Sequence, residues 1–410
     1  MRLLWLLNVT LVAFASALPK RYDNYVVYRV TPQSEKALES LRSLNKYEDV
    51  EFLIPLTKVG HTAAVLLPPQ YQNIFLEEHR NLNDYINVEV VLQNVQEAII
   101  DEGLRPESKA GSFDWDYYYT LDDMQKWING LRLKYPNNVE MINLKTYENR
   151  NLTVVKVVFN PNATKAVFVE AGMHAREWIG PAVATYILNE IIHSSDSKIV
   201  ELRNKFNWYI APVVNPDGFV YSFKDRFWRK TRTPVTKPSG KICIGIDPNR
   251  NWDFHFGEGG EICNDTYPGP YAFSETCTRE LSNFLLNIPE KVQSYIGLHS
   301  YSEKILMPYS NSSEHLDNYD QVYKIAKEAA KVLKGVNGED FGVGTAAEML
   351  PQGSVVGASM DWVKEKMRVP YVVTYELRGK DFILPANQII PASIETLQSI
   401  LYSVKEAEHL

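Results

Sequence analysis

The sequence of 410 residues contains only three cysteines, no long run of lysine and arginine, and a single long apolar run, at its amino end. With a formal net charge of −7, the lack of basic runs argues against nucleic acid or an anionic membrane as the main partner. The cysteines are Cys243, Cys263 and Cys277. In an oxidising compartment, any two of the three would be expected to form a disulfide. Three buried apolar thiols are the alternative.

The apolar run at the amino end is typical of a secretory signal peptide. It extends from Leu3 to Val12 after a single Arg2, and the small residues Ala15-Ser16-Ala17 follow. A membrane anchor is the alternative, but the run is shorter than the roughly 20 apolar residues that a spanning helix needs. We therefore expect residues 1–17 to be removed and the protein to be secreted. Four acceptor sequons fit a secreted surface: Asn151, Asn162, Asn264 and Asn311.

Composition and length predict one large domain and one smaller one, since 45% of the residues are hydrophobic and 23% are charged. In the smaller part, strand patterns occur at 25–30, 51–56, 61–67 and 88–92, and helical patterns at 34–44 and after 68–69. The order β-α-β-β-α-β predicts a ferredoxin-like α+β unit. It contains no His, Cys and Glu cluster of metal-site spacing, so we expect the chemistry in the larger domain.

A polar segment at 99–113 separates the two parts and contains Arg105 and Lys109. Such linkers are preferred sites of proteolysis. A trypsin-like protease would be hindered after Arg105 because Pro106 follows, so the bond between Lys109 and Ala110 is the predicted activation site. A plain inter-domain linker is the alternative.

From about residue 120 onward, strand and helix patterns alternate. Strands are predicted at 166–171, 206–214, 292–298 and 371–377, and helices at 181–192 and 319–333. This alternation predicts an α/β domain with a mixed, largely parallel sheet and helices on both faces. In such sheets the active site lies beyond the carboxyl ends of the strands.

Two of these strands end in residues that could bind a metal. His174 and Glu177 follow the strand at 166–171, and His299 follows the apolar residues 295–298. Two histidines and one glutamate are a three-ligand zinc set that leaves the fourth position for water or substrate. A His-x-x-Glu pair alone is a weak signal, because a histidine at a strand end is commonly just hydrogen-bonded.

A carboxylate and a cationic group complete the candidate site. Glu376 stands in an apolar strand, where it must be solvated, paired with Arg378, or a general base that takes a proton from water at the metal. Basic residues recur at 226–232 and around Arg250. Guanidinium groups bind carboxylates and stabilise oxyanions, although an exposed basic turn is the alternative.

Taken together, five motifs resemble the zinc carboxypeptidases of the pancreatic A and B type, and the resemblance extends over nearly the whole chain. The motifs are His174-Ala-Arg-Glu177, Trp228-Arg229-Lys-Thr-Arg, Asp247-Pro-Asn-Arg250-Asn-Trp-Asp, His299-Ser-Tyr301 and Tyr375-Glu376-Leu-Arg.

The resemblance implies a role for each of these residues. His174, Glu177 and His299 would bind one zinc ion. Glu376 would be the general base and then the proton donor to the leaving amine, and Arg229 would stabilise the oxyanion. The substrate's terminal carboxylate would be bound by Asn249 and Arg250, while Arg176 and Tyr301 would line the neighbouring subsites and Phe382 would form a wall.

The resemblance also implies the organisation of the chain. Residues 18–109 would be an inhibitory propeptide with its connecting segment, and residues 110–410 the catalytic domain. Cys243 and Cys263 would form a disulfide, leaving Cys277 free. Peptide and protein C-termini would be the substrates, a trypsin-like protease the activator, and digestion the natural role.

The sequence departs from the family pattern at the substrate pocket. A tyrosine that usually caps the substrate, about eight residues before the pair Asp361-Trp362, is absent, and 350–354 reads Leu-Pro-Gln-Gly-Ser. Met360 favours an A-like preference for apolar or aromatic C-terminal residues, whereas Ser310 and Gly344 are typical of B-type enzymes, which prefer Lys or Arg.

Two rival functions remain. An inactive homologue that only binds peptides is favoured by the missing tyrosine alone. A metallo-amidohydrolase without a need for a free C-terminus is disfavoured because Asn249 and Arg250 are both present.

Overall fold

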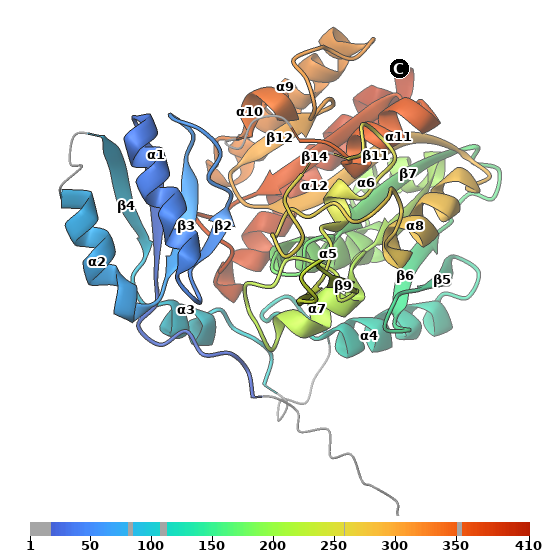
Figure 1. The fold of residues 1–410 in the computed structure, drawn as a ribbon. Coiled ribbons are helices and arrows are strands. Elements are labelled where there is room, and N and C mark those ends of the chain that lie inside the picture. Colours follow the sequence, from blue (N-terminus) through green and yellow to red (C-terminus); the bar gives the residue numbers. More distant parts are fainter. Residues whose placement is uncertain (1–17, 81–84, 107–112, 258, 351–354) are drawn as a thin grey trace, which may run out of the picture.

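The computed structural model describes residues 18–80, 85–106, 113–257, 259–350 and 355–410, which form two units side by side (Figure 1). The predicted signal peptide, the Lys109–Ala110 bond and most of the loop that lacks the tyrosine lie outside these ranges. Within the described ranges, no helix combines the length and the apolar character that crossing a membrane requires.

The amino-terminal unit has the predicted order of elements. It consists of β1 (Val26–Pro32), α1 (Glu35–Arg42), β2 (Glu51–Ile54), β3 (Ala63–Leu67), α2 (Pro69–Arg80) and β4 (Ile86–Leu92), followed by α3 (Val95–Asp101). The sheet is antiparallel in the order β2-β3-β1-β4. Helix α1 begins at Ser34, whose side chain accepts a hydrogen bond from the backbone N–H of Ala37. The ferredoxin-like prediction is confirmed, and β2 is the strand that faces the larger unit (Figure 1).

The larger unit contains an eight-stranded mixed sheet in the order β13-β12-β14-β11-β7-β8-β6-β5. Its strands are β5 (Val139–Lys145), β6 (Asn151–Val157), β7 (Lys165–Ala171), β8 (Phe206–Ala211), β11 (Lys291–Ser300), β12 (Lys304–Met307), β13 (Gly342–Thr345) and β14 (Tyr371–Leu377). The central strands β14, β11, β7 and β8 are parallel, whereas β5, β6 and β12 pair antiparallel with their inner neighbours. The predicted α/β class is thereby confirmed.

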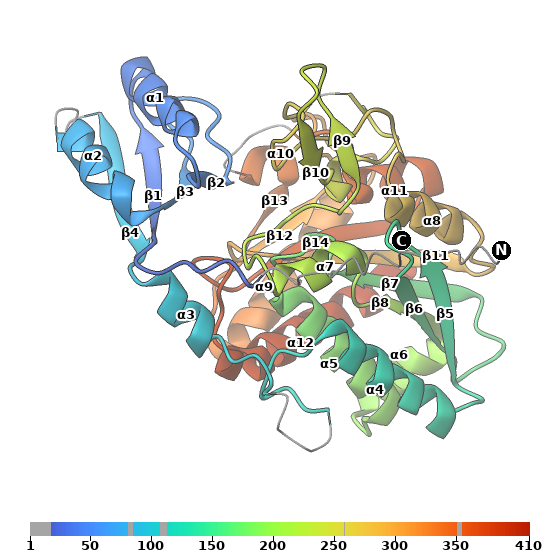
Figure 2. The same cartoon turned by 60° about the horizontal axis from the view of Figure 1, so that its bottom comes forward.

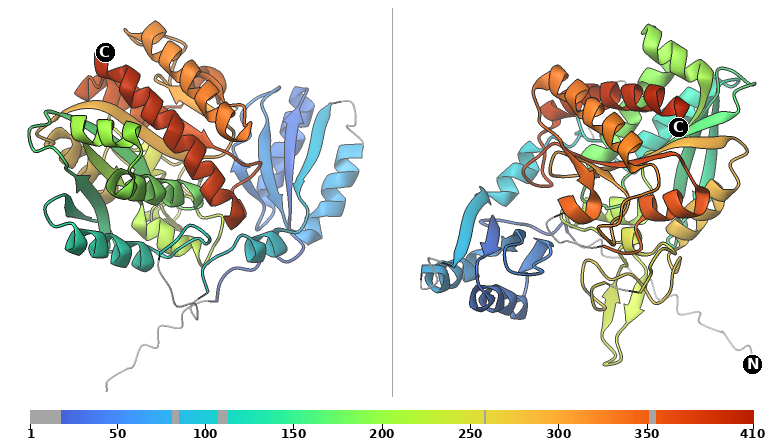
Figure 3. Two further views of the ribbon diagram at one scale, coloured as in Figure 1. Left: turned by 180° about the vertical axis from the view of Figure 1, so that it is seen from behind. Right: turned by 90° about the horizontal axis from the view of Figure 1, so that it is seen from above.

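Helices cover both faces of this sheet, and both faces are apolar. One face is covered by α4 (Leu121–Lys134), α5 (Ile179–His193), α6 (Ser197–Lys205), α9 (Tyr319–Asn337) and α12 (Ile389–Glu406). Seen from behind, α12 and α9 run next to each other over the sheet (Figure 3). The other face is covered by α8 (Thr276–Leu286), α10 (Ala346–Met349) and α11 (Ser359–Met367). The short α7 (Pro216–Ser222) follows β8.

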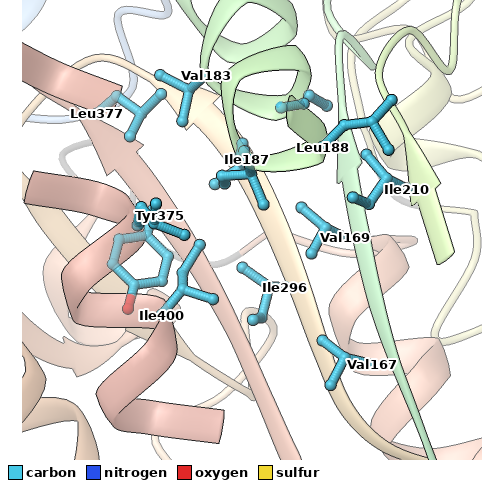
Figure 4. Packing of buried hydrophobic residues seen from close by; sticks show 14 of the residues in the cluster. Val167, Val169, Val183, Ile187, Leu188, Ile210, Ile296, Tyr375, Leu377 and Ile400 are labelled. Carbon is cyan, nitrogen blue, oxygen red and sulfur yellow. The ribbon is translucent and has the colours of Figure 1, made fainter. Parts of the chain in front are cut away.

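The core under α5 shows why the central strands are continuous apolar runs. Ile187 and Leu188 of α5 point toward Val169, Ile210 and other strand residues, all within one buried cluster (Figure 4). A strand that is covered on both faces must bury both of its side-chain rows, so its sequence is mostly apolar rather than alternating.

Some elements differ from the sequence prediction. The strand predicted at 206–214 ends at Ala211, because Pro212 has no N–H to continue the ladder. Strands β5, β6, β12 and β13 were not predicted. A separate two-stranded hairpin, β9 (Pro234–Thr236) and β10 (Ile242–Ile244), extends from the body of the larger unit (Figure 2). The structure joins Cys243 of this hairpin to Cys263 in a disulfide and leaves Cys277 as a buried free thiol.

Candidate active site

The candidate site lies at the carboxyl ends of three adjacent parallel strands. His174 stands in the turn after β7, and His299 near the end of β11 is directly opposite Glu376 on β14. The turn after β7 depends on Gly172, which has a φ of +62°. A Cβ at that position would lie 3.1 Å from Pro181 and 3.1 Å from the Val213 backbone. Glycine therefore permits the tight turn that directs His174 toward its neighbours.

His174, Glu177 and His299 converge as a candidate metal site, and all three are buried. The His174 Nδ1 atom lies 2.7 Å from Glu177 Oε1, and the His299 Nδ1 atom lies 3.0 Å from Glu177 Oε2. Burial acts in the opposite direction, yet the two imidazoles hold the pKa of the Glu177 carboxyl well below its usual range. Two ring nitrogens and one carboxylate oxygen are a donor set that zinc accepts, so these residues fit the metal that the sequence implies.

A buried carboxylate supports this set from behind. Asp247 Oδ1 lies 3.3 Å from His174 Nε2, on the side of the ring away from Glu177. Such an outer partner fixes the orientation of a metal-binding histidine. Asp247 Oδ2 also accepts hydrogen bonds from Arg229 Nη2 at 2.9 Å and Nε at 3.1 Å. Asp247 stands in one of the five motifs, but its position in the sequence did not indicate this role.

Glu376 has a carboxyl group whose pKa lies near neutral pH. Burial raises its pKa to about 7, and the nearby Glu177 adds to this shift, while His299 opposes it. A group that titrates near the working pH is well suited to accept a proton during a reaction. The alternative, a salt bridge with Arg378, is not what the structure contains. Arg378 is paired with Glu395 instead, with its Nε donating to Oε1 at 2.8 Å.

The cationic residues are buried rather than part of an exposed turn. Arg250 lies at the end of a 3₁₀ turn, Pro248–Arg250, that begins at Asp247, and its Nη1 atom is 4.0 Å from Asp247 Oδ2. The neighbouring Asn249 accepts a hydrogen bond from the Ser359 backbone N–H at 2.9 Å through its Oδ1 atom. Burial alone would raise the pKa of Asp247, but Arg229 and Arg250 hold it well below its usual range. The negative charge of Asp247 thus stabilises the positive charges of both guanidinium groups.

One cavity contains nearly all of the residues that the sequence singled out. Its wall includes the metal set and the following residues: Arg176, Arg229, Asn249, Arg250, Tyr301, Ser310, Met360, Glu376 and Phe382. Tyr301 and Phe382 meet edge to face with ring centroids 4.9 Å apart, and the Arg176 guanidinium lies 4.3 Å from the Phe382 ring centroid. Residues that sequence reasoning missed also line it, among them Leu306, Val355, Ala358 and Thr374.

Gly344 is the exception. It is not among the described residues that form the cavity wall. A Cβ at Gly344 would lie 2.8 Å from Met349 Cγ and 3.0 Å from its Sδ, so the Met349 side chain of α10 occupies the space beside it. The assignment of Gly344 to the specificity pocket therefore stays a prediction.

Residues of the amino-terminal unit also line the cavity, and nothing in the sequence predicted which ones. They are Phe52, Leu53, Ile54 and Pro55, at the end of β2. The Leu53 carbonyl accepts a hydrogen bond of 2.7 Å from Arg176 Nη2. Arg176 also donates from Nη1 to Asp265 at 2.9 Å.

A shared apolar cluster holds the two units together beside this cavity. Tyr22 and Leu53 of the amino-terminal unit pack with Phe227 and Phe382 of the larger one. Tyr22 is completely buried, meets the Phe227 ring edge to face, and donates a hydrogen bond of 2.6 Å to Asp225.

Comparisons with known proteins give both units a family. Residues 124–399 match the zinc carboxypeptidase family, and residues 28–102 match the carboxypeptidase activation peptide. Zinc carboxypeptidase A 1 of Anopheles gambiae is 40% identical over 400 residues, which cover 94% of this chain and 90% of that protein. Carboxypeptidase B of Rattus norvegicus is 31% identical over the full length of both chains. The crystal structure of thrombin activatable fibrinolysis inhibitor superposes with a TM-score of 0.87 at 26% identity, covering 94% of this chain and all of that one.

Proposed function

The chain belongs to the zinc carboxypeptidase family of hydrolases that cleave C-terminal peptide bonds, and we propose that it is a secreted zymogen of such an enzyme with a digestive role. We assign residues 1–17 to a signal peptide, 18–109 to the inhibitory propeptide and its connecting segment, and 110–410 to the catalytic domain. The signal-like amino end and the activation peptide at 28–102 support this division.

The proposed zinc site consists of His174, Glu177 and His299, whose donor atoms already converge. When bound there, zinc would supply Lewis-acid chemistry that polarises the scissile carbonyl and favours attack by water. Asp247 holds the His174 ring in place, since it lies against the opposite ring nitrogen.

Glu376 is the proposed general base. It takes the proton from the attacking water and later donates it to the leaving amine. Arg229 lies 3.9 Å from Glu177 through its Nη1 atom, so its charge stands beside the metal set, where an oxyanion would develop. Arg229 therefore stabilises the negative charge on the former carbonyl oxygen.

The observation that carries the proposal is the position of Arg250 and Asn249 in the same cavity as the metal set and Glu376. A buried guanidinium group binds a carboxylate strongly, and an adjacent amide can add a further hydrogen bond. Together they would grip the substrate's terminal carboxylate and set the scissile bond against the reacting groups. This grip makes the enzyme an exopeptidase. Arg176 and Tyr301 line the subsites for the preceding residues, and Phe382 is a wall.

Inhibition by the propeptide follows from the end of β2. The Leu53 carbonyl occupies the Arg176 donor that a substrate backbone carbonyl would otherwise use, and Phe52–Pro55 fill the approach to the cavity. Cleavage of the connecting segment by a trypsin-like protease, at Lys109–Ala110, would allow the amino-terminal unit to leave.

An A-like preference is the proposed specificity. Met360, Leu306 and Val355 give the cavity apolar lining, which suits aromatic or apolar C-terminal residues. The small Ser310 on the same cavity keeps a B-like preference for Lys or Arg as the alternative. The relatives carry both A-type and B-type names. An inactive peptide-binding homologue is less well supported, because the metal set, the base and both carboxylate-binding residues share one cavity.

The proposed function is tested with one peptide sequence prepared with a free and with an amidated C-terminus, ending in Phe or in Arg. After trypsin treatment, the protein should release the last residue only from the free acid, and faster for Phe than for Arg. Arg250→Ala should lower kcat/KM by about 30-fold or more, because a desolvated carboxylate loses its charged partner. Arg132 is exposed, so Arg132→Ala is the matched control and should leave kcat/KM unchanged. Equal cleavage of the amide would reject an exopeptidase, and faster release of Arg would reverse the specificity.

A further inference from the structure

The segment 355–361 lies against the two residues that are proposed to bind the substrate's terminal carboxylate. Three residues of this segment line the cavity: Val355, Ala358 and Met360. Gly357 and Ser359 stand between them in the sequence and are not among the described residues of the cavity wall. The roles assigned above leave these two residues without a function, although both contact the carboxylate-binding pair.

Gly357 packs directly against the backbone of Arg250. Its φ is +67°, a conformation that favours glycine, and a Cβ there would lie 2.6 Å from the Arg250 carbonyl carbon and 3.2 Å from its Cα atom. Two backbone hydrogen bonds fix this approach. The Trp252 N–H donates to the Gly357 carbonyl at 3.1 Å, and the Gly357 N–H donates to the Phe254 carbonyl at 3.0 Å. A side chain at position 357 would therefore displace the backbone that carries the Arg250 guanidinium.

Ser359 holds the neighbouring residue of the pair, Asn249. The Ser359 backbone N–H donates a hydrogen bond of 2.9 Å to Asn249 Oδ1. Ser359 is the first residue of α11, where a backbone N–H has no acceptor within the helix. An amide side chain has one acceptor end and one donor end, so this contact decides which end is which. The donor end, Nδ2, is thereby the end that can face a carboxylate.

The segment that carries these two contacts is itself tied down at both ends. The Val355 N–H donates to the Ser310 carbonyl at 2.7 Å, and Asp361 Oδ2 accepts a hydrogen bond of 3.0 Å from the Ser310 N–H. Both Ser310 and Asp361 are buried. The backbone at Gly357 and Ser359 therefore has a fixed position from which to support Arg250 and Asn249.

We propose that Gly357 and the backbone N–H of Ser359 are positioning groups for the terminal carboxylate of the substrate. Gly357 sets the place of Arg250, and Ser359 sets the orientation of Asn249. The inference rests on the proposed function, which gives those two residues the carboxylate. A guanidinium–carboxylate pair depends on its geometry, so a displaced Arg250 would bind the carboxylate weakly while the metal set and Glu376 stayed in place.

The test measures binding of one peptide with a free or an amidated C-terminus. Calorimetry on the Glu376→Gln variant, loaded with zinc and treated with trypsin, gives the ratio of the two affinities, which we call the acid preference. We expect an acid preference of about 30-fold or more in this background. Adding Gly357→Ala should lower it about tenfold or more. Gly240→Ala is the matched control, because Gly240 has a φ of +85° but no atom within 4 Å of a Cβ. It should leave the acid preference unchanged.

Ser359→Pro and Ser359→Ala form a second comparison. Proline is well tolerated at the first residue of a helix, and the preceding Ala358 is already extended, with a ψ of 146°. Ser359→Pro thus removes the N–H that holds Asn249 and should lower the acid preference about fivefold or more. Ser359→Ala is the conservative variant, since it removes only the hydroxyl, and it should retain the acid preference.

Double variants separate positioning from a general loss of structure. Once Arg250→Ala is present, adding Gly357→Ala should change the acid preference by less than about twofold, because the group on which Gly357 acts is gone. The same holds for Ser359→Pro in an Asn249→Ala background. Zinc content and the unfolding midpoint show which variants keep their fold. If Gly357→Ala does not fold, the Ser359 comparison decides.

An unchanged acid preference in a folded Gly357→Ala or Ser359→Pro variant would overturn the inference. Losses of equal size with and without Arg250 or Asn249 would also overturn it. If the wild type still released the last residue from the free acid, the proposed function would stand. Conversely, an acid preference that depends on Gly357 and Ser359 in a protein without hydrolytic activity would uphold the inference and reject the proposed function.

Discussion

At the scale of single residues, Asp247 connects the parts of the site. Its carboxylate lies against His174, accepts hydrogen bonds from Arg229 and caps the turn that carries Asn249 and Arg250. Arg229 and Arg250 stabilise its charge although it is completely buried. One acidic residue thus orients a proposed metal ligand, the proposed oxyanion-binding group and the proposed carboxylate-binding group at once. The positions of the reacting residues therefore depend on the hydrogen-bond and ion-pair partners that hold them.

Glu376 gives the first prediction at this scale. A carboxyl group accepts a proton only when it is ionised, and burial raises the pKa of Glu376 to about 7. The rate constant kcat/KM should therefore rise with pH along an acid limb whose midpoint lies at or below about pH 7, since a bound cation would lower the pKa further.

The variant Glu376→Gln should bind zinc like the wild type and lose about 10³-fold in kcat/KM, within the range for removal of a general base. Rates between pH 5 and 9 on a peptide ending in Phe, together with zinc analysis, check both expectations. A variant that kept wild-type rates, or a wild type whose rates did not depend on pH below 7, would remove Glu376 from this role.

At the scale of elements, the site depends on the register of parallel strands and on one strand from outside the catalytic domain. The pairing of β11 with β14 puts His299 opposite Glu376. Strand β2 ends at the cavity mouth and supplies the Leu53 carbonyl to Arg176. In the proposed zymogen, the same polar donor would hold the propeptide and would be exposed once the propeptide leaves.

Tyr22 should contribute strongly to this inhibited state. Its ring is buried against Phe227 across the interface, and its hydroxyl donates to Asp225. Truncation of a large buried aromatic side chain costs about 3–5 kcal/mol. Tyr22→Ala should therefore loosen the propeptide and increase peptide hydrolysis before trypsin treatment by about tenfold or more.

Tyr22→Phe keeps the ring packing and loses only the hydrogen bond, so its effect should be smaller. Tyr85→Ala is the matched control, because Tyr85 is exposed on the same unit. The measurement compares hydrolysis before and after trypsin for the three variants. If Tyr22→Ala hydrolysed peptide no faster than the wild type before trypsin treatment, the Tyr22 contacts would not hold the propeptide in place.

The central elements of the fold could be predicted because their sequences carry strong local signals. Strands such as 166–171 and 371–377 are apolar except at Glu170, Thr374 and Glu376, as burial on both faces favours. The strands at the sheet edges escaped prediction for physical reasons. Strands β12 and β13 have four residues each, and β5 is half exposed, so neither length nor apolar pattern distinguishes them from loops.

At the scale of the whole molecule, contacts between distant segments could not be predicted. The motifs predicted that His174, His299 and Arg250 share one site. No sequence signal predicted that the end of β2 would line the same cavity. The sequence also could not show that the Met349 side chain packs beside Gly344.

At this scale, the proposed latency of the chain rests on the residues of the amino-terminal unit that line the cavity. The activation peptide covers a cavity that already contains the metal set, the base and the carboxylate-binding residues. We propose that binding of the propeptide and binding of substrate are mutually exclusive, so that hydrolysis requires both zinc and removal of the propeptide.

The most direct test follows release of C-terminal Phe by the full-length chain of known zinc content, before and after trypsin, with chelator and with zinc restored. We expect about one zinc per chain. We expect little release of Phe before trypsin, rapid release afterwards, loss of this activity with chelator and its recovery with zinc. Release that is equally fast before trypsin would contradict the inhibited zymogen. No release from folded, zinc-loaded, trypsin-cut protein would contradict the proposed enzyme itself.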